Sequence, residues 1–244
     1  MDRTYNRIKE RRDDLLRIIP KTRSSILEIG AREGYHTKIL AKYFDNVTAL
    51  DLVKPKFNFK NVTTVEGNVT CLDFEDCSFD VVMCAEVLEH LAPESLQNAC
   101  SEIIRVSKYE VVIGVPFKQD LRVGRTTCIT CGKHNPPYAH LSSFDQNKLE
   151  NLFKPLVPIE ISFVGTKNLR SNILSVYLMD ISGNPYGSYD QEEACLYCGN
   201  KLKPIKGLCL LQRVYTALAN RVNHIQRLFY EPIPRWIHIV FQKK

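Results

Sequence analysis

The chain has 244 residues, of which 44% are hydrophobic, and this is enough for one full α/β domain with additional segments. Its formal charge of +6 is modest and is spread along the sequence, which argues mildly against a dedicated nucleic-acid groove. The N-terminus lacks the apolar stretch of a secretory signal, and no apolar run approaches the ~18 residues of a membrane span. We therefore expect a cytoplasmic protein without a transmembrane segment.

The first predicted segment covers residues 1–23. Residues 4–18 have the apolar spacing of an amphipathic helix, which Pro20 ends. Lys and Arg are dense here, but acidic residues interleave with them. This pattern favours a solvated helix face over a nucleic-acid-binding arm.

A short apolar run at residues 26–29 ends abruptly at Gly30, as in a strand buried on both faces of a parallel sheet. A helix over 35–44 and a second strand over 47–50 follow, and the second strand leads directly into Asp51. Strand, glycine turn, helix, strand and acid form the first half of a dinucleotide-type fold. Its glycines let a ligand approach the backbone, and its acid accepts hydrogen bonds from ribose hydroxyls.

The residues from Glu28 to Gly34 decide which cofactor is expected. Arg32 stands where the dinucleotide fingerprint has its second glycine, and Glu28 adds a carboxylate that repels a pyrophosphate but can hold a cationic amino acid group. The heptapeptide resembles the first motif of class I S-adenosylmethionine-dependent methyltransferases, E/D-x-G-x-G-x-G, and departs from it at Arg32. An ordinary strand-turn-helix is the alternative.

This resemblance implies S-adenosylmethionine as the cofactor. It also implies an α/β fold, a doubly wound Rossmann-like sheet of seven strands with helices on both faces. The cofactor-binding residues that it implies are Glu28, Gly30, Ala31, Arg32, Gly34, Asp51, Leu52, Asn68, Val69, Cys84 and Ala85. Asn68 is the candidate adenine contact, with a plain turn asparagine after Gly67 as the alternative.

Further strands are predicted at 62–65, 81–84, 111–115 and 157–164, and helices at 93–104, 142–153 and 209–229. Residues 236–241 are assigned as the antiparallel seventh strand. Residues 172–180 are the competing candidate, as a strand or a short helix. The apolar stripe of the 209–229 helix favours core or partner packing over a membrane face.

The string Glu86-x-x-Glu89-His90 follows the fourth strand. It resembles the Glu-x-x-Glu-His of ubiquinone-pathway O-methyltransferases and small-RNA 2′-O-methyltransferases, where these residues hold a divalent metal, which implies Mg²⁺ or Mn²⁺ here. The alternative is that they are polar loop residues without a metal. We select His140, His90 and Glu86 as catalytic candidates, and favour His140 as a general base for a hydroxyl acceptor.

Two Cys-x-x-Cys pairs, Cys128/Cys131 and Cys195/Cys198, are each followed by glycine. Four thiolates at this spacing predict one structural zinc site, although each pair alone could be a redox motif. A chain without a secretory signal is not expected to have a disulfide framework. The other five of the nine cysteines lie mostly among apolar residues and are interpreted as small buried side chains.

The expected segments are an N-terminal helix (1–23), a cofactor-binding core (24–116), a Cys-containing insertion (117–141), the rest of the α/β core (142–180), a second zinc knuckle (181–205), and a C-terminal helix with the closing strand (206–244). The insertion loosely resembles bacterial methyltransferases of glycan and cell-surface biosynthesis. We therefore expect O-methylation of a small molecule or a sugar precursor of a glycan. A metal-dependent RNA 2′-O-methyltransferase and a non-catalytic module that binds S-adenosylmethionine and zinc are the alternatives.

Overall fold

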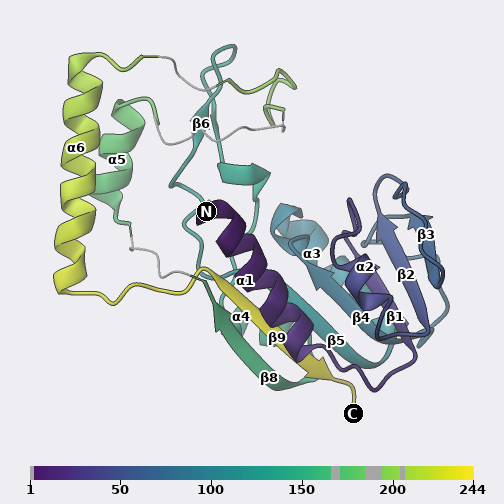
Figure 1. The fold of residues 1–244 in the computed structure, drawn as a ribbon. Coiled ribbons are helices and arrows are strands. Elements are labelled where there is room, and N and C mark those ends of the chain that lie inside the picture. Colours follow the sequence, from purple (N-terminus) through teal and green to yellow (C-terminus); the bar gives the residue numbers. More distant parts are fainter. Residues whose placement is uncertain (1–2, 166–170, 185–193, 204–206) are drawn as a thin grey trace. The chain divides into compact units, whose positions relative to one another are not determined.

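A computed structural model describes residues 3–165, 171–184, 194–203 and 207–244 (Figure 1). The chain forms two compact units. Unit 1 comprises Met1–Phe117, Phe144–Thr166 and Pro234–Lys244, and unit 2 comprises Lys118–Ser143 and Lys167–Ile233. None of the helices in the described ranges has the length and apolar character needed to cross a bilayer.

Unit 1 is built on a seven-stranded sheet with the order β3-β2-β1-β4-β5-β9-β8. The strands are β1 (Ser25–Ile29), β2 (Asn46–Asp51), β3 (Val62–Glu66), β4 (Phe79–Ala85), β5 (Ser107–Pro116), β8 (Val157–Val164) and β9 (Trp236–Gln242). The first five are parallel, whereas β9 is antiparallel to both of its neighbours, β5 and β8. The predicted sheet and its antiparallel C-terminal strand are confirmed.

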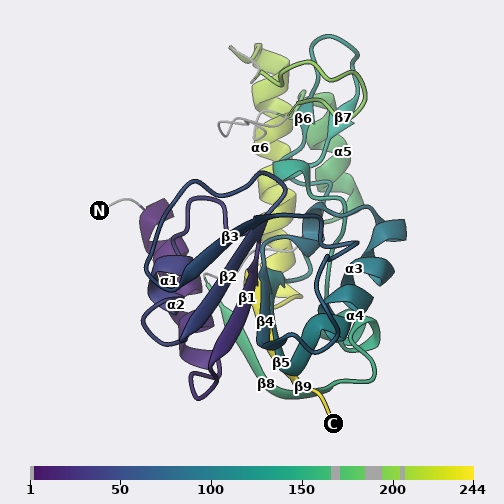
Figure 2. The ribbon, with the colours of Figure 1, turned by 90° about the vertical axis from the view of Figure 1, so that its right-hand side faces the viewer.

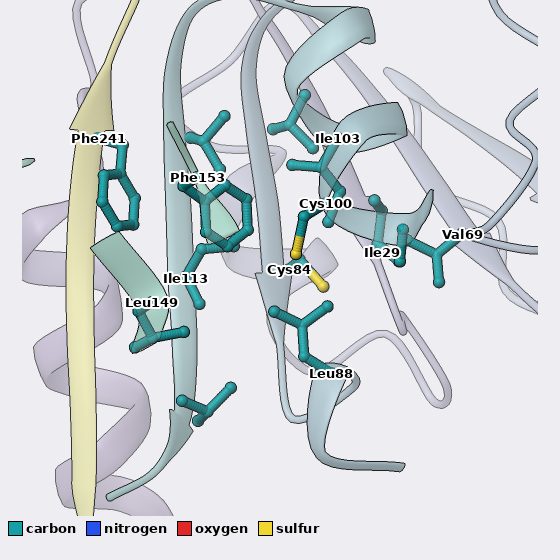
Figure 3. Packing of buried hydrophobic residues seen from close by; sticks show 14 of the residues in the cluster. Ile29, Val69, Cys84, Leu88, Cys100, Ile103, Ile113, Leu149, Phe153 and Phe241 are labelled. Atoms are coloured by element: carbon teal, nitrogen blue, oxygen red, sulfur yellow. The ribbon is translucent and has the colours of Figure 1, made fainter. Parts of the chain in front are cut away.

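Helices cover both faces of this sheet (Figure 2). On one face, α1 (Arg3–Ile18) and α2 (Thr37–Leu40) pack over one apolar cluster, and on the other, α3 (Pro93–Val106) and α4 (Gln146–Leu152) pack over a second. Successive strand residues alternate between the two clusters, as the period of a pleated strand requires. In Figure 3, Phe153 lies against Phe241, with ring centroids 5.1 Å apart.

Unit 2 contains a two-stranded hairpin, β6 (Thr126–Thr127) with β7 (His134–Asn135), and a 3₁₀ turn, η2 (Pro137–Ala139). It also contains α5 (Ile173–Ile181), α6 (Leu210–Ile225) and the 3₁₀ turn η3 (Gln226–Leu228). The helices α5 and α6 lie side by side (Figure 1).

The structure corrects several expectations about elements. Residues 172–180 do not form a strand: Asn172 and Ser175 form a capping box, with Asn172 Oδ1 accepting the Ser175 N–H at 2.8 Å, and a helix follows. This helix belongs to unit 2, not to the α/β core, and the C-terminal segment divides between α6 in unit 2 and β9 in unit 1.

Two helices also start or end elsewhere than predicted. The α4 helix begins at Gln146 and not at residue 142, because it is capped by Asp145, whose Oδ1 accepts the Lys148 N–H at 2.9 Å. The predicted 35–44 helix is reduced to α2 and flanking turns, whose backbone hydrogen bonds continue to Phe44.

Candidate functional site

The glycine turn lies at the carboxyl end of β1. Gly30 has φ +84°, and its N–H donates to the Leu50 carbonyl at 2.8 Å. A Cβ on Gly30 would lie 2.4 Å from Val87 Cγ2, and one on Gly34 would lie 2.7 Å from the Phe57 ring. Both positions therefore require glycine, for backbone conformation and for space.

Arg32, where the motif departs from glycine, keeps the backbone conformation that glycine favours, with φ +43°. Its N–H donates to Asp51 Oδ2 at 2.8 Å, and the Leu52 N–H donates to Asp51 Oδ1 at 2.7 Å. Each carboxylate oxygen of Asp51 is thus fixed by one backbone donor beside the turn. The departure at Arg32 changes a side chain but leaves the turn in place.

Glu28 is buried in β1, and only Ile29 separates it from the turn that begins at Gly30. Thr37 donates its hydroxyl to Glu28 Oε2 at 2.5 Å, and His36 Nδ1 lies 3.6 Å from Oε1. Neither His36 nor Thr37 was a predicted site residue, and they stand near Glu28 only because α2 begins where the turn ends. These two side chains hold the buried carboxylate.

The remaining cofactor candidates differ in exposure. Asn68 Oδ1 accepts hydrogen bonds from the backbone and hydroxyl of Thr70, at 3.0 and 2.9 Å, which is the geometry of an Asx turn. Val69, Cys84 and Ala85 are buried, and desolvation raises the pKa of the Cys84 thiol. Leu52 is 68% exposed. Of these, Asn68 and Leu52 have surface available to a ligand.

Glu86 and Glu89 follow β4 in unit 1. Glu86 has φ +57° and forms an ion pair with Arg11 of α1, which the sequence did not predict. Glu89, in the 3₁₀ turn η1 (Leu88–His90), is fully buried, and neither carboxylate oxygen has a hydrogen-bond partner within the described part of the chain. Burial, and then the charge of Glu86, raise the pKa of Glu89 well above its ordinary value.

His140 belongs to unit 2, whereas Glu86 and His90 belong to unit 1, so their joint catalytic role stays a prediction. His140 Nδ1 lies 2.6 Å from Gln119 Oε1. An amide oxygen only accepts hydrogen bonds, so Nδ1 carries the hydrogen and Nε2 is the basic nitrogen of the neutral ring. Gln119 was not identified from the sequence, because no pattern links it to His140.

The four predicted cysteines come together within unit 2, with their sulfur atoms all within 4.8 Å of one another. Cys128 Sγ lies 3.7 Å from Cys198 Sγ, and Cys131 Sγ lies 3.7 Å from Cys195 Sγ. Four sulfurs at 2.3 Å from a tetrahedral Zn²⁺ would be about 3.8 Å apart. The cluster therefore has the dimensions of a tetrathiolate zinc site.

The two halves of this cluster are alike. Gly132 donates its N–H to the Cys128 carbonyl and Gly199 donates to the Cys195 carbonyl, both at 2.9 Å, and both glycines have φ +71°. Each pair is thus a knuckle whose glycine permits the tight turn. The repeated turn explains why each Cys-x-x-Cys needs a glycine after it.

Asn135 supports the cluster from β7. Its Nδ2 lies 3.4 Å from Cys195 Sγ, and its Oδ1 accepts the Leu196 N–H at 2.9 Å. Desolvation raises the pKa of Cys195, but donors from the Tyr197 backbone and Asn135 lower it to about 6 overall. A thiol with a low pKa is readily a thiolate, the form in which cysteine binds metal.

Unit 2 also contains two cavities. One, of about 390 Å³, is lined by Leu121, Arg125, Lys133, His134, Pro136 and Tyr197. The other, of about 340 Å³, lies along α5 and α6 and is lined by Arg122, Val123, Gly124, Ser175, Val176, Met179, Asn184, Asn220 and Asn223. The first is the more basic and adjoins the second cysteine knuckle in sequence.

Known proteins resemble part of this chain in sequence. Residues 27–113 match the model of a family described as "Methyltransferase domain". Two curated proteins of Mycobacterium tuberculosis, each named a "Probable S-adenosylmethionine-dependent methyltransferase", are 28% identical over 120 residues, which are 46% of this chain and 43% of the relative. The match thus spans less than half the length of these relatives.

Solved structures resemble the chain over more of its length. A SAM-dependent methyltransferase from Archaeoglobus fulgidus is 18% identical, with TM-score 0.52, over 95% of this chain and 92% of that one. One from Mesorhizobium loti is 10% identical, with TM-score 0.54, over 95% and 96%. A Burkholderia thailandensis N1-methyltransferase, solved with bound S-adenosylhomocysteine, is 14% identical, with TM-score 0.53, over 96% and 76%. The chain therefore has the Rossmann-like methyltransferase fold.

Proposed function

We propose that this chain transfers the methyl group of S-adenosylmethionine to a hydroxyl group of a small molecule or of a sugar precursor of a glycan. The observation that carries the proposal is the glycine turn at the carboxyl end of β1, with Asp51 fixed beside it by the Arg32 and Leu52 N–H groups. In open α/β sheets, ligands bind at this edge. The methyltransferase-domain match over residues 27–113 covers the same segment.

The residues present fit the cofactor. Asp51 would accept hydrogen bonds from ribose hydroxyls, and the backbone of the Gly30–Gly34 turn allows a ligand close approach. Glu28 would provide the negative charge for the amino acid group, with Thr37 and His36 holding its carboxylate. When bound, S-adenosylmethionine supplies a methyl group on a sulfonium, whose positive charge already favours transfer.

A hydroxyl acceptor must lose a proton, and we assign this task to His140. Its Nδ1–H donates to Gln119, which leaves Nε2 as the nitrogen that would take the proton.

We further propose that Cys128, Cys131, Cys195 and Cys198 bind a structural Zn²⁺. The sulfur–sulfur distances of 3.7 Å from one Cys-x-x-Cys pair to the other support this, as do the two matched glycine turns. Zinc would stabilise the loop that carries Gln119 and His140, since both knuckles lie in the same unit as that loop.

A second candidate function is methylation of an RNA 2′-hydroxyl with a divalent metal. The observation that favours it is Glu89, whose buried carboxylate lacks a hydrogen-bond partner within the described residues. A buried carboxyl group is stabilised either by a proton or by a cation. In the second case Mg²⁺ or Mn²⁺ would be held near Glu86, Glu89 and His90.

Calorimetric titration with S-adenosylmethionine, followed by methyl-transfer assays on nucleotide sugars, phenols and RNA, tests these proposals. We expect binding, and transfer to a sugar or phenol hydroxyl that continues with a chelator too weak to remove the zinc. Transfer to RNA that stops with this chelator and returns with Mg²⁺ would support the second candidate. Absence of binding would refute both, and binding without transfer to any acceptor class would favour a non-catalytic module.

A further inference from the structure

The α6 helix exposes a row of large apolar side chains. Leu211, Leu218 and Ile225 recur every seven residues and are 66%, 44% and 57% exposed, and Val214, between them, is 47% exposed. Positions spaced in this way fall on one side of a helix. Half of the exposed large apolar side chains of the described residues come from α5, α6 and residues 228–230.

Packing among the described residues of unit 2 does not account for this row. The side of α6 that is buried is centred on Ala219, which has no exposed surface, and α5 packs along the helix. Leu211, Leu218 and Ile225 therefore lie outside the contact that holds the two helices together. Exposed apolar surface of this extent marks an interaction site.

The charge of the segment identifies the partner. Residues 194–230 contain no Asp or Glu but contain six basic residues, Lys201, Lys203, Lys206, Arg213, Arg221 and Arg227. Arg213 and Arg221 are exposed on the same helix as the apolar row. A basic helix with one apolar side is typical of segments that lie on anionic lipid surfaces.

We infer that α6 docks this protein on the surface of an anionic lipid bilayer, with its apolar row in the acyl boundary and its arginines at the headgroups. A second copy of the chain fits less well, because pairing of two identical α6 rows would bring Arg221, which lies beside the row, into the interface from each copy without an acidic partner on the helix. The lipid surface supplies the missing negative charge. The inference does not depend on the proposed methyl transfer.

Sedimentation of the full chain with lipid vesicles tests the inference. We expect the protein to bind vesicles of phosphatidylcholine with about one third phosphatidylglycerol, and to bind pure phosphatidylcholine or vesicles in high salt much more weakly. Leu218→Glu and Ile225→Glu should each lower the partition coefficient at least about tenfold, since each puts a charged side chain in place of an apolar one that would be buried in the lipid. Ile159→Glu is the matched control, because Ile159 is also exposed and apolar (52%) but lies in β8 of unit 1.

A second pair of variants separates charge from apolar contact. Arg213→Gln and Arg221→Gln should each weaken binding to the anionic vesicles about fivefold and leave binding to neutral vesicles unchanged. Equal binding by the wild type and both glutamate variants, or no binding to anionic vesicles, would overturn the inference. Light scattering gives the other outcome: a dimer that dissociates on Leu218→Glu, without vesicle binding, would show that a second copy covers the row.

Discussion

Unit 1 and unit 2 differ in what holds them together. Unit 1 has an apolar cluster on each face of its sheet, built from side chains that are almost entirely buried. In the described part of unit 2, the buried hydrophobic cluster consists of Cys128, Cys195 and Leu202, and the helices expose many apolar residues. Unit 1 therefore has the core of an independent domain, whereas the described part of unit 2 buries little apolar surface, and we propose that a bound zinc ion stabilises it.

The largest effect is expected from removing the proposed zinc, which should destabilise unit 2 and not unit 1. Cys128→Ser should abolish stoichiometric zinc and unfold unit 2, because apparent free energies of structural zinc binding reach about 10–16 kcal/mol. Unit 1 should keep its thermal transition and its affinity for S-adenosylmethionine. Elemental analysis and calorimetric melting measure both effects.

Cys209→Ser is the matched control for this experiment, because Cys209 is an exposed cysteine of unit 2 outside the cluster. It should leave the zinc content unchanged and change melting little, because Cys209 is the N-cap of α6 and serine is also a good N-cap. A Cys128→Ser protein that melts like the wild type, or a wild-type protein with disulfides and no zinc, would contradict the prediction.

Shortening one buried side chain of unit 1 and one exposed side chain of unit 2 tests the difference in packing between the units. Ile103 of α3 is fully buried in unit 1, so Ile103→Ala should lower the free energy of unfolding by about 2–5 kcal/mol. Leu228 of unit 2 is 80% exposed, so Leu228→Ala should change it by less than about 0.5 kcal/mol. Urea unfolding at neutral pH measures both. A large loss for Leu228→Ala would mean that unit 2 has a packed core at this position.

The secondary structure of unit 1 could be predicted from the sequence more completely than that of unit 2. The strands of unit 1 are short apolar runs bounded by turn residues, and their order follows from βαβ connections, so the seven-stranded sheet could be predicted. The four-cysteine group could be predicted because its spacing is specific. Residues 172–180 were assigned to the α/β core because an apolar run without a period does not distinguish a strand from a helix.

Contacts between side chains distant in sequence could not be predicted. Thr37 with Glu28, Arg11 with Glu86, and Asn135 with Cys195 each depend on tertiary packing. The conformation of Arg32 was also unexpected, since its left-handed backbone is visible only in the structure. Sequence patterns nominated the candidate groups, but could not predict the neighbours that orient them.

Within unit 1, the cofactor site should be separable from stability. Asp51→Ala should weaken binding of S-adenosylmethionine about tenfold to a hundredfold, because a hydrogen-bonded carboxylate contributes roughly 1.5–3 kcal/mol. Its melting temperature should change little. Asp45→Ala, an exposed carboxylate in the loop before β2, should bind normally. Unchanged affinity on calorimetric titration of Asp51→Ala would refute the assignment.

At neutral pH the smallest effect is expected at a buried pair in unit 1, which becomes important on acidification. His238 of β9 is fully buried, and its Nδ1 lies 2.7 Å from Asp14 Oδ2. Burial lowers the pKa of His238, against the opposing influence of Asp14. Burial alone would raise the pKa of Asp14, but hydrogen bonds from His238, Arg17 and Ser162 lower it from 3.8 to about 2. Around pH 7 both groups already have the charge that the fold favours.

Because the pKa values of His238 and Asp14 are both lowered in the folded protein, lowering the pH decreases the free energy of unfolding in two stages. As the pH falls through about 6.5, the unfolded chain protonates at His238 while the folded chain resists, so the free energy of unfolding decreases. As it falls from 3.8 to about 2, the stabilising contribution of the Asp14 carboxylate is lost as well. Urea unfolding between about pH 8 and pH 2 should show this decline, and Asp14→Asn should remove the Asp14 contribution to the lower stage. Asp45→Asn, at an exposed carboxylate, should retain both stages, and an Asp14→Asn profile that parallels the wild type would exclude Asp14 as the titrating group.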